Sequence, residues 1–192
     1  MSYLESQFSL SGRRIIVTGA AGLLGRQFCE ALGKAGAELS LLDIDETALT
    51  DLGSALSDMN LSCATYVVDI TDKHSVSSVI QQIAGIGPIH GLINSAAIDP
   101  KFEPGGEWLD KNPSAFSTYS VENWRRSLDV NLTGMFLVTQ AACKHIEEYP
   151  DADCSIINIS SIMAYVGSAG GHPAYSASKG AIVGMTLPMA RD

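Results

Sequence analysis

A tyrosine and a lysine one helical turn apart, Tyr175 and Lys179, follow a pair of adjacent serines, Ser160 and Ser161. Residues at i and i+4 of a helix project from the same face, so the lysine ammonium would lie beside the phenol. A nearby positive charge favours the phenolate, which suits the tyrosine to give and take a proton. The spacing therefore indicates acid/base chemistry on an alcohol or a carbonyl, although Tyr-x-x-x-Lys alone also occurs by chance.

A glycine-rich turn near the N-terminus lies between a predicted apolar strand, residues 14–17, and a helix with apolar positions Phe28, Ala31, Leu32 and Ala35. Glycines in such a turn let the backbone approach a pyrophosphate, whose charge is stabilised at the helix N-terminus. For the glycines alone, an ordinary strand-to-helix turn is the alternative. In this context we expect dinucleotide contacts from Gly19, Ala21, Gly22, Leu23, Leu24 and Gly25.

An aspartate, Asp43, ends the next predicted strand, residues 38–42. In a dinucleotide-binding fold a carboxylate at this place accepts hydrogen bonds from the adenosine ribose and repels a 2′-phosphate. Positions 20, 21 and 44 carry no lysine or arginine that would favour that phosphate. NAD is therefore favoured as cofactor over NADP. Asp43 could instead cap the following helix, but Asp45 is better placed for that role.

Strands and helices alternate along the rest of the chain. Further helices are predicted over residues 47–56, 73–83 and 121–148, and further strands over residues 64–68, 91–94 and 155–160. This alternation is typical of a parallel sheet covered by helices on both faces. We expect an α/β fold with a doubly wound parallel sheet in three α/β/α layers, the Rossmann fold. Residues 1–192 would form a single domain.

Together with further segments of the chain, these features resemble the short-chain dehydrogenase/reductase family. Asp69 matches an aspartate that lies beside the adenine, Asn94-Ser95-Ala96-Ala97 is similar to the segment after the fourth strand, and Asn131 matches a catalytic asparagine. The resemblance implies cofactor contacts from Asp69, Ile70, Asn94, Ala96, Tyr175 and Lys179. It also implies a catalytic tetrad of Tyr175, Lys179, Ser161 and Asn131.

The same resemblance implies the roles within that tetrad. Tyr175 would be the general acid/base, and Lys179 would hold the nicotinamide ribose. Ser161 would hydrogen-bond the substrate oxygen, with Ser160 as the fallback if the register shifts. Asn131 would hold a water that relays protons from Lys179. The expected activity is NAD-dependent hydride transfer between a secondary alcohol and a ketone, with sugar derivatives among the candidate substrates.

Two alternatives stay open. The spacing Gly19-x-x-Gly22-x-x-Gly25, with Leu23 at a usual glycine position, is similar to the extended branch of the family. That branch contains nucleotide-sugar epimerases and dehydratases, which retain bound NAD. The segment from Tyr175 to Lys179 favours the single-domain branch instead. The other alternative is a non-catalytic dinucleotide-binding fragment.

The second alternative is suggested by the end of the chain. A helix predicted from Tyr175 onward reaches Asp192 without a stop signal, whereas family members continue through further strands. We therefore expect a chain that is incomplete at its C-terminus and lacks the last strands of the sheet. The resemblance also implies a homo-oligomer, a tetramer or dimer, formed through the helices at 121–148 and after Tyr175.

Composition excludes other classes of protein. A net charge of −9 argues against a nucleic-acid partner, and no apolar run is long enough to span a membrane. The four cysteines show no metal-ligand spacing, so we expect no metal site and reduced thiols in a cytoplasmic protein. The long segment after Ala97 offers Lys101, Trp108 and Phe116 as candidate substrate contacts, and His172 lies close to Tyr175. A surface loop is the simpler interpretation of that segment.

Overall fold

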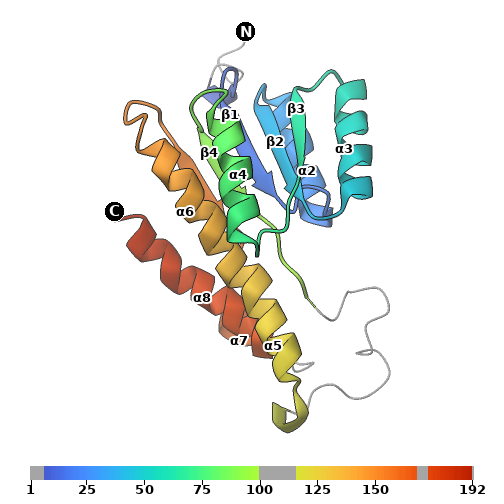
Figure 1. The fold of residues 1–192 in the computed structure, drawn as a ribbon, viewed down its shortest axis with the longest axis vertical. Helices are drawn as coiled ribbons and strands as arrows, with labels where there is room; N and C mark the ends of the chain where they lie inside the picture. The colour runs from blue at the N-terminus through green and yellow to red at the C-terminus, as the bar shows by residue number, and fades with distance from the viewer. Residues whose placement is uncertain (1–6, 100–115, 168–172, 192) are drawn as a thin grey trace. The chain divides into compact units, whose positions relative to one another are not determined.

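The computed structural model describes residues 7–99, 116–167 and 173–191 (Figure 1). Its contacts divide the chain into two compact units. The sheet unit comprises residues 1–96 and 137–157, and the helical unit comprises residues 97–136 and 158–192. The glycine turn belongs to the sheet unit, and the Tyr-Lys pair belongs to the helical unit.

The sheet unit is built on a five-stranded sheet with the order β3-β2-β1-β4-β5. The strand pairs β1 with β2, β1 with β4 and β2 with β3 are all parallel. In such a sheet the strand order reverses beside β1, and ligands bind at the carboxyl ends of the strands at that point. The strands are β1 (Arg14–Thr18), β2 (Glu38–Asp43), β3 (Cys63–Val67), β4 (Gly91–Asn94) and β5 (Ser155–Asn158).

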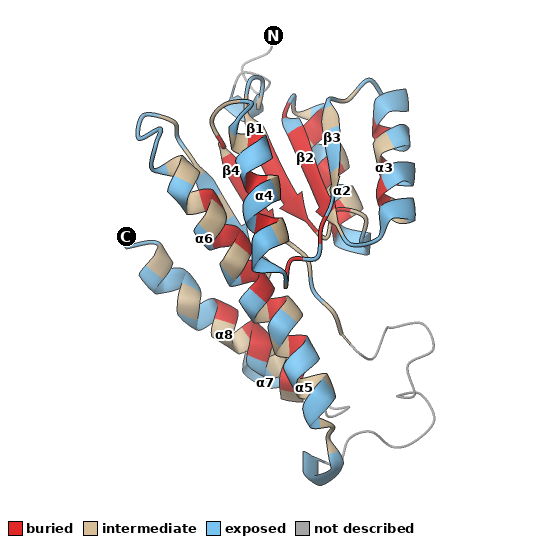
Figure 2. Cartoon of the chain, viewed as in Figure 1, coloured by how far each residue is buried: buried red, intermediate tan, exposed pale blue. Residues whose placement is uncertain are grey.

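Helices of this unit cover the sheet and bury its apolar strands. The strand interiors carry the core, with Ile16, Val17, Leu41 and Leu92 fully buried (Figure 2). Asp45 accepts a hydrogen bond from the Ala48 N–H, so it caps the next helix as expected. The helices are α2 (Leu23–Lys34), α3 (Glu46–Asp58), α4 (Lys73–Ala84) and α6 (Met135–Ile146), of which α6 begins in the helical unit.

The helical unit departs most from the sequence-based expectation. The single helix predicted over residues 121–148 is instead α5 (Val121–Leu128), a π-helical segment η4 (Asp129–Gly134) and then α6. A π segment widens the helix by one residue and is frequent at functional sites. The unit also contains the short η3 (Phe116–Thr118) and α7 (Met163–Val166), which the sequence did not indicate.

Helix α8 (Pro173–Met189) begins two residues before Tyr175, the start expected from the sequence. Proline suits the first turn of a helix because its missing N–H has no partner there. The buried residues of α8 are Ala174, Ser178, Lys179 and Ile182, so the face that carries Lys179 packs inside the unit. No helix in the described parts of the chain is long and apolar enough to cross a bilayer.

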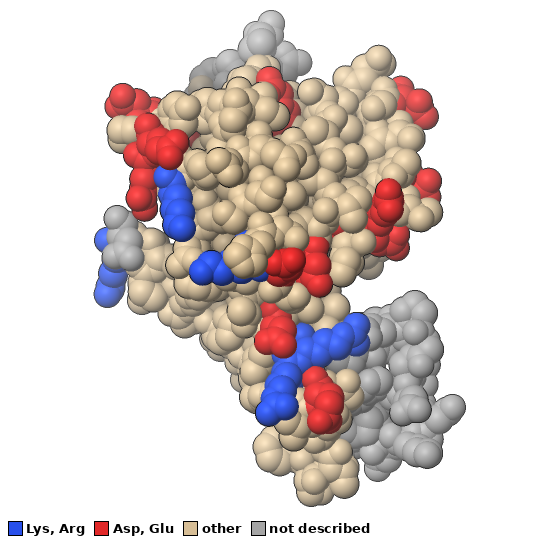
Figure 3. Space-filling model, in the orientation of Figure 1, with Lys and Arg blue, Asp and Glu red and all other residues tan. Residues whose placement is uncertain are grey.

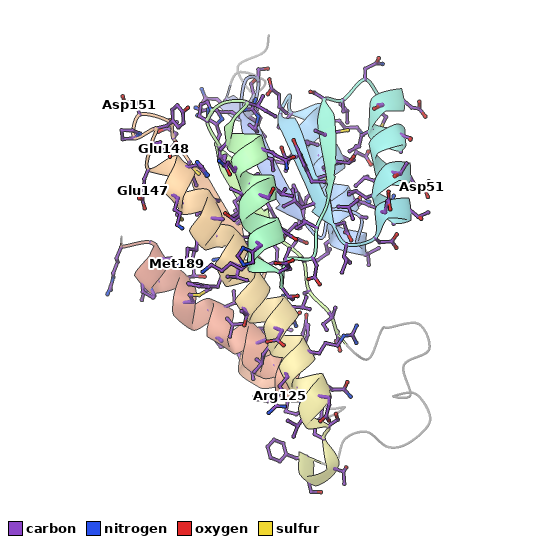
Figure 4. All side chains as sticks on the ribbon, in the orientation of Figure 1. Asp51, Arg125, Glu147, Glu148, Asp151 and Met189 are labelled. Atoms are coloured by element: carbon purple, nitrogen blue, oxygen red, sulfur yellow. The ribbon has the colours of Figure 1, made fainter. Side chains whose placement is uncertain are left out.

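Acidic side chains gather on the turn after α6, where Glu147, Glu148 and Asp151 lie (Figures 3 and 4). This turn leads into the amino end of β5, where the Ser155 N–H donates to the His90 carbonyl just before β4. The acidic turn therefore lies at the amino edge of the sheet, whereas the glycine turn follows the carboxyl end of β1.

The four cysteines are free thiols. Burial raises the pKa of the Cys29 thiol to about 12 and also raises the pKa values of the thiols of Cys63, Cys143 and Cys154. A thiol reacts as its thiolate, so these side chains are poorly reactive at neutral pH. Only Cys29 is fully buried, whereas Cys63, Cys143 and Cys154 are half-buried.

Candidate active site

The glycine turn requires glycine at two positions for steric reasons. Gly19 has a φ of +63°, and a Cβ built there would lie 2.6 Å from the Ala96 Cα. A Cβ on Gly25 would lie 2.1 Å from the Gly19 carbonyl oxygen. Any side chain at either place would force the backbone apart. The turn is therefore closely packed against both the segment after β4 and its own helix, α2.

Leucine at position 23 does not disturb this turn. Gly22 is the N-cap of α2, and Leu23 is its first helical residue. The side chains of Leu23 and Leu24 are 87% and 53% exposed, so they point out of the sheet unit. The departure from the usual glycine spacing thus leaves the backbone of the turn in a strand–turn–helix arrangement that can receive a pyrophosphate.

Asp43 lies at the carboxyl end of β2 and is tied to the turn. Its Oδ2 accepts a hydrogen bond from the Ala21 N–H at 2.9 Å, and its Oδ1 accepts one from the Asp45 N–H at 3.1 Å. Each carboxylate oxygen has a second lone pair. The side chain is therefore fixed in direction while keeping acceptor capacity for ribose hydroxyls.

The segment after β4 is held beside β1 by Thr18. The Thr18 Oγ1 accepts hydrogen bonds from the N–H groups of Ser95 and Ala96, at 3.1 and 3.2 Å. Asn94 is buried, and its Nδ2 donates to the Thr139 Oγ1 of α6 at 2.9 Å. Thr18 is a residue that the sequence analysis missed, although it directly precedes the first glycine of the turn.

Asp69 and Ile70 follow β3. The exposed Asp69 accepts hydrogen bonds at Oδ1 from both the N–H and the hydroxyl of Thr71, at 2.8 and 2.7 Å. Ile70 is only 7% exposed. Asp69 thus keeps Oδ2 for another donor, while the side chain of Ile70 packs in the core.

Lys179 and Tyr175 lie on one face of α8, as their spacing predicts. The Lys179 Nζ is 5.7 Å from the centroid of the Tyr175 ring and donates a hydrogen bond of 2.7 Å to the Ile159 carbonyl. Lys179 is 3% exposed, and this burial lowers the pKa of its ammonium from 10.5 to about 8. The lysine therefore exchanges its proton close to neutral pH.

The adjacent serines have different partners. Ser160 Oγ donates to the Lys179 carbonyl at 2.8 Å, whereas Ser161 Oγ accepts the Met163 N–H at 3.2 Å. Ser160 is therefore committed to α8, and Ser161 keeps its own proton to donate. The strand was predicted to reach Ser160, but β5 ends at Asn158. The Ile159 carbonyl is bonded to the Lys179 side chain and Ser160 Oγ to the Lys179 carbonyl, which accounts for the earlier end.

Asn131 is buried within η4, and its amide is used internally. Its Oδ1 accepts the Ile98 N–H at 2.7 Å, while its Nδ2 donates to the Ile98 carbonyl at 2.9 Å and to Ser178 Oγ at 3.2 Å. Ser178 Oγ in turn donates to the Tyr175 carbonyl at 2.8 Å. The side chain of Asn131 therefore supports the start of α8. Both Nδ2 protons are used, so a water at this side chain would donate to the remaining lone pair of Oδ1. Ser178 was missed from the sequence because only the fold brings it to Asn131.

Some sequence-based candidates cannot be placed. Lys101, Trp108 and His172 lie outside the described residues. Phe116 is described and is 82% exposed in η3. The helical unit thus brings together Tyr175, Lys179, Ser160, Ser161 and Asn131, while the predicted dinucleotide contacts other than Tyr175 and Lys179 lie in the sheet unit.

Solved structures with this fold include NAD+-bound xylitol dehydrogenase, with a TM-score of 0.81 and 26% identity over 95% of this chain and 65% of that one. Actinorhodin polyketide ketoreductase with NADPH matches with a TM-score of 0.80 and 25% identity, over 92% of this chain and 63% of the other. Both are similar to this chain across nearly all of its length. They confirm the Rossmann-type α/β fold.

Relatives in sequence include the gluconate 5-dehydrogenase of Gluconobacter oxydans, 31% identical over 96% of this chain and 67% of the relative. The 5-keto-D-gluconate 5-reductase of Escherichia coli is 30% identical over 97% of this chain and 68% of its own. The chain thus spans about two thirds of the length of both relatives. The family model described as short chain dehydrogenase matches residues 13–192. The chain belongs to the short-chain dehydrogenase/reductase family, whose members are oxidoreductases that act on CH–OH groups with a nicotinamide dinucleotide.

Proposed function

We propose that this protein is an NAD-dependent oxidoreductase that interconverts a secondary alcohol and a ketone on a polyol or sugar acid. The observation that carries the proposal is the burial of Lys179 beside the ring of Tyr175 on α8. The substrate class is supported by relatives named for gluconate and xylitol chemistry.

The sheet unit fits a nicotinamide dinucleotide. Only a glycine backbone can make the close approach at Gly19 and Gly25, and Asp43 keeps acceptor capacity for a ribose. When bound, the cofactor would supply or accept the hydride. The pyrophosphate would lie against the N-terminal end of α2, where the backbone N–H groups and the helix dipole favour negative charge.

Proton transfer falls to the helical unit. Tyr175 would give a proton to the carbonyl oxygen in reduction and take it back in oxidation. Lys179 would stabilise the phenolate and exchange its own proton with solvent, which its pKa of about 8 permits. Ser161 would donate a hydrogen bond to the substrate oxygen as charge develops there. Asn131 would act indirectly, through Ser178 and the Tyr175 carbonyl.

Asp43 would set the preference for NAD(H) over NADP(H). Asp43→Ser removes the carboxylate that repels the 2′-phosphate. The ratio of the NADPH to the NADH dissociation constant should therefore fall by about tenfold or more. Titration of NADH and NADPH fluorescence against both proteins measures the two dissociation constants. Asp51→Ser, on the exposed face of α3, is a matched control for the loss of one negative charge (Figure 4). Tighter binding of NADPH than NADH by the wild type would contradict the proposal.

The function itself is tested by assay of the full-length protein with NAD+ or NADH against polyols, sugar acids and their keto derivatives. Turnover should be seen as a change in absorbance of the reduced nicotinamide. The Gly22 spacing favours a second candidate, a nucleotide-sugar epimerase or dehydratase. That enzyme would be purified with NAD bound and would show no net turnover of added cofactor. Retained NAD released on denaturation, with no activity on alcohols, would therefore support the second candidate.

We also propose that the full-length protein is a homo-oligomer, a dimer or a tetramer. Apolar side chains on the helices support it, because Phe136, Val183 and Leu187 are 44%, 37% and 59% exposed. Most soluble oligomers are symmetric assemblies of one chain. Light scattering at micromolar concentration should give a mass of at least twice that of one chain.

A further inference from the structure

Arg26, near the start of α2, holds two backbone carbonyls that belong to different elements of the sheet unit. Its Nε donates to the Ala21 carbonyl at 2.9 Å, and its Nη2 donates to the Ala48 carbonyl at 3.0 Å. Ala21 lies in the glycine turn, and Ala48 lies in the first turn of α3. Because a guanidinium is planar and its donors are fixed in direction, it sets the separation of the two carbonyls.

Asp43 holds the same two elements through their N–H groups. Its Oδ2 accepts from the Ala21 N–H, and its Oδ1 accepts from the N–H of Asp45, the N-cap of α3. The glycine turn and the start of α3 are therefore each held twice, by Arg26 at a carbonyl and by Asp43 at an N–H. Ala21 is fixed on both of its flanking peptide groups.

This arrangement links the arginine to the carboxylate without a direct contact between them. If Arg26 were absent, the Ala21 carbonyl and the start of α3 would lose a charged donor. The peptide between Ala21 and Gly22 could then turn, and the neighbouring peptide that carries the Ala21 N–H would be less firmly aimed at Asp43. The carboxylate would lose the bond that fixes its direction.

We propose that Arg26 is a positioning residue for cofactor choice: it keeps the Asp43 carboxylate in the pose that accepts the adenosine ribose and excludes a 2′-phosphate. The inference rests on the proposed function, because it assumes that this turn binds NAD(H). In this proposal Arg26 acts through the two protein carbonyls that its Nε and Nη2 hold, not by recognising the cofactor itself.

The test is a comparison of NADH and NADPH affinity for Arg26→Met in the full-length protein, by fluorescence titration. We expect NADH binding to weaken about five- to tenfold, with a smaller change for NADPH, so that the preference narrows. Arg26→Lys should be intermediate, because an ammonium can replace a donor but not the planar fork. In the double variant with Asp43→Ser, the preference should equal that of Asp43→Ser alone, since coupled residues are not additive.

Arg14→Met is the matched control. Arg14 is a half-buried arginine on β1 whose Nη2 lies 2.9 Å from Glu38 Oε2. Its loss should lower the free energy of unfolding and leave the cofactor preference unchanged. If Arg26→Met likewise lowers the free energy of unfolding but leaves the NADH-to-NADPH preference unchanged, Arg26 has a purely structural role and the inference is overturned.

Two other results separate the inference from the function on which it rests. If Arg26→Met strengthens the preference for NADH, the arginine acts as a cation toward the 2′-phosphate, and the inference is wrong while the function stands. If the wild type binds neither NADH nor NADPH, the proposed function fails, and this inference fails with it.

Discussion

Tyr175→Phe should abolish turnover in the full-length protein, with a fall in kcat of about 10²–10⁴-fold and nearly unchanged NADH binding. The substitution removes only the hydroxyl, so the half-buried ring keeps its place beside Lys179. What is lost is the group that would transfer the proton in the proposed function. Steady-state kinetics and NADH titration measure the two effects separately.

The matched control for this loss is Tyr149→Phe, which removes a hydroxyl from a 41% exposed tyrosine just after α6. Its kinetics should equal those of the wild type. Ser161→Ala should lower kcat with little effect on NADH binding, and Ser160→Ala should be milder. A Tyr175→Phe protein that keeps most of its activity would show that this residue is not the acid/base.

Lys179→Met should have the next largest effect, lowering kcat about 100-fold or more and weakening NADH binding. In the proposed function the ammonium stabilises the phenolate and also holds the nicotinamide ribose, so both kcat and the NADH dissociation constant should change. Lys144→Met, on the last turn of α6, removes an exposed lysine and should change neither.

The same substitution should change how stability depends on pH. Burial lowers the pKa of Lys179 from 10.5 to about 8, a shift that corresponds to roughly 3 kcal/mol. Between these pH values the unfolded chain holds a proton that the folded chain has lost, so this residue makes stability rise with pH in that window. Urea unfolding at pH 7, 8.5 and 10 should show that rise in the wild type and a smaller one in Lys179→Met. Equal slopes would mean that folding does not lower the pKa of Lys179.

The sequence was sufficient for features that depend on local pattern. Apolar runs and helical periodicity placed the strands within a residue or two, and the glycine spacing located the turn before α2. The juxtaposition of Tyr175 and Lys179 also follows from helix geometry alone. These features need no knowledge of what lies elsewhere in the chain.

Other features depend on contacts between residues far apart in sequence. The π segment within 121–148 contains Asn131, whose amide is bonded to Ile98 and Ser178, neither of which a local pattern connects to it. The early end of β5 follows from bonds to Lys179 on α8. The different hydrogen-bond partners of Ser160 and Ser161 also depend on such distant contacts. So does the hydrogen bond from Arg26 to the Ala48 carbonyl. Sequence alone names the residue types but not these partners.

The proposed cofactor-selecting residues and the proposed proton-transfer residues belong to different units, which bears on how cofactor preference can evolve. The residues that would choose between NAD and NADP, Asp43 and Arg26, belong to the sheet unit, and Tyr175 and Lys179 belong to the helical unit. Under the proposed function, substitutions in the sheet unit would change whether the protein exchanges electrons with the NAD(H) or the NADP(H) pool. The proton transfer by the helical unit would be inherited unchanged.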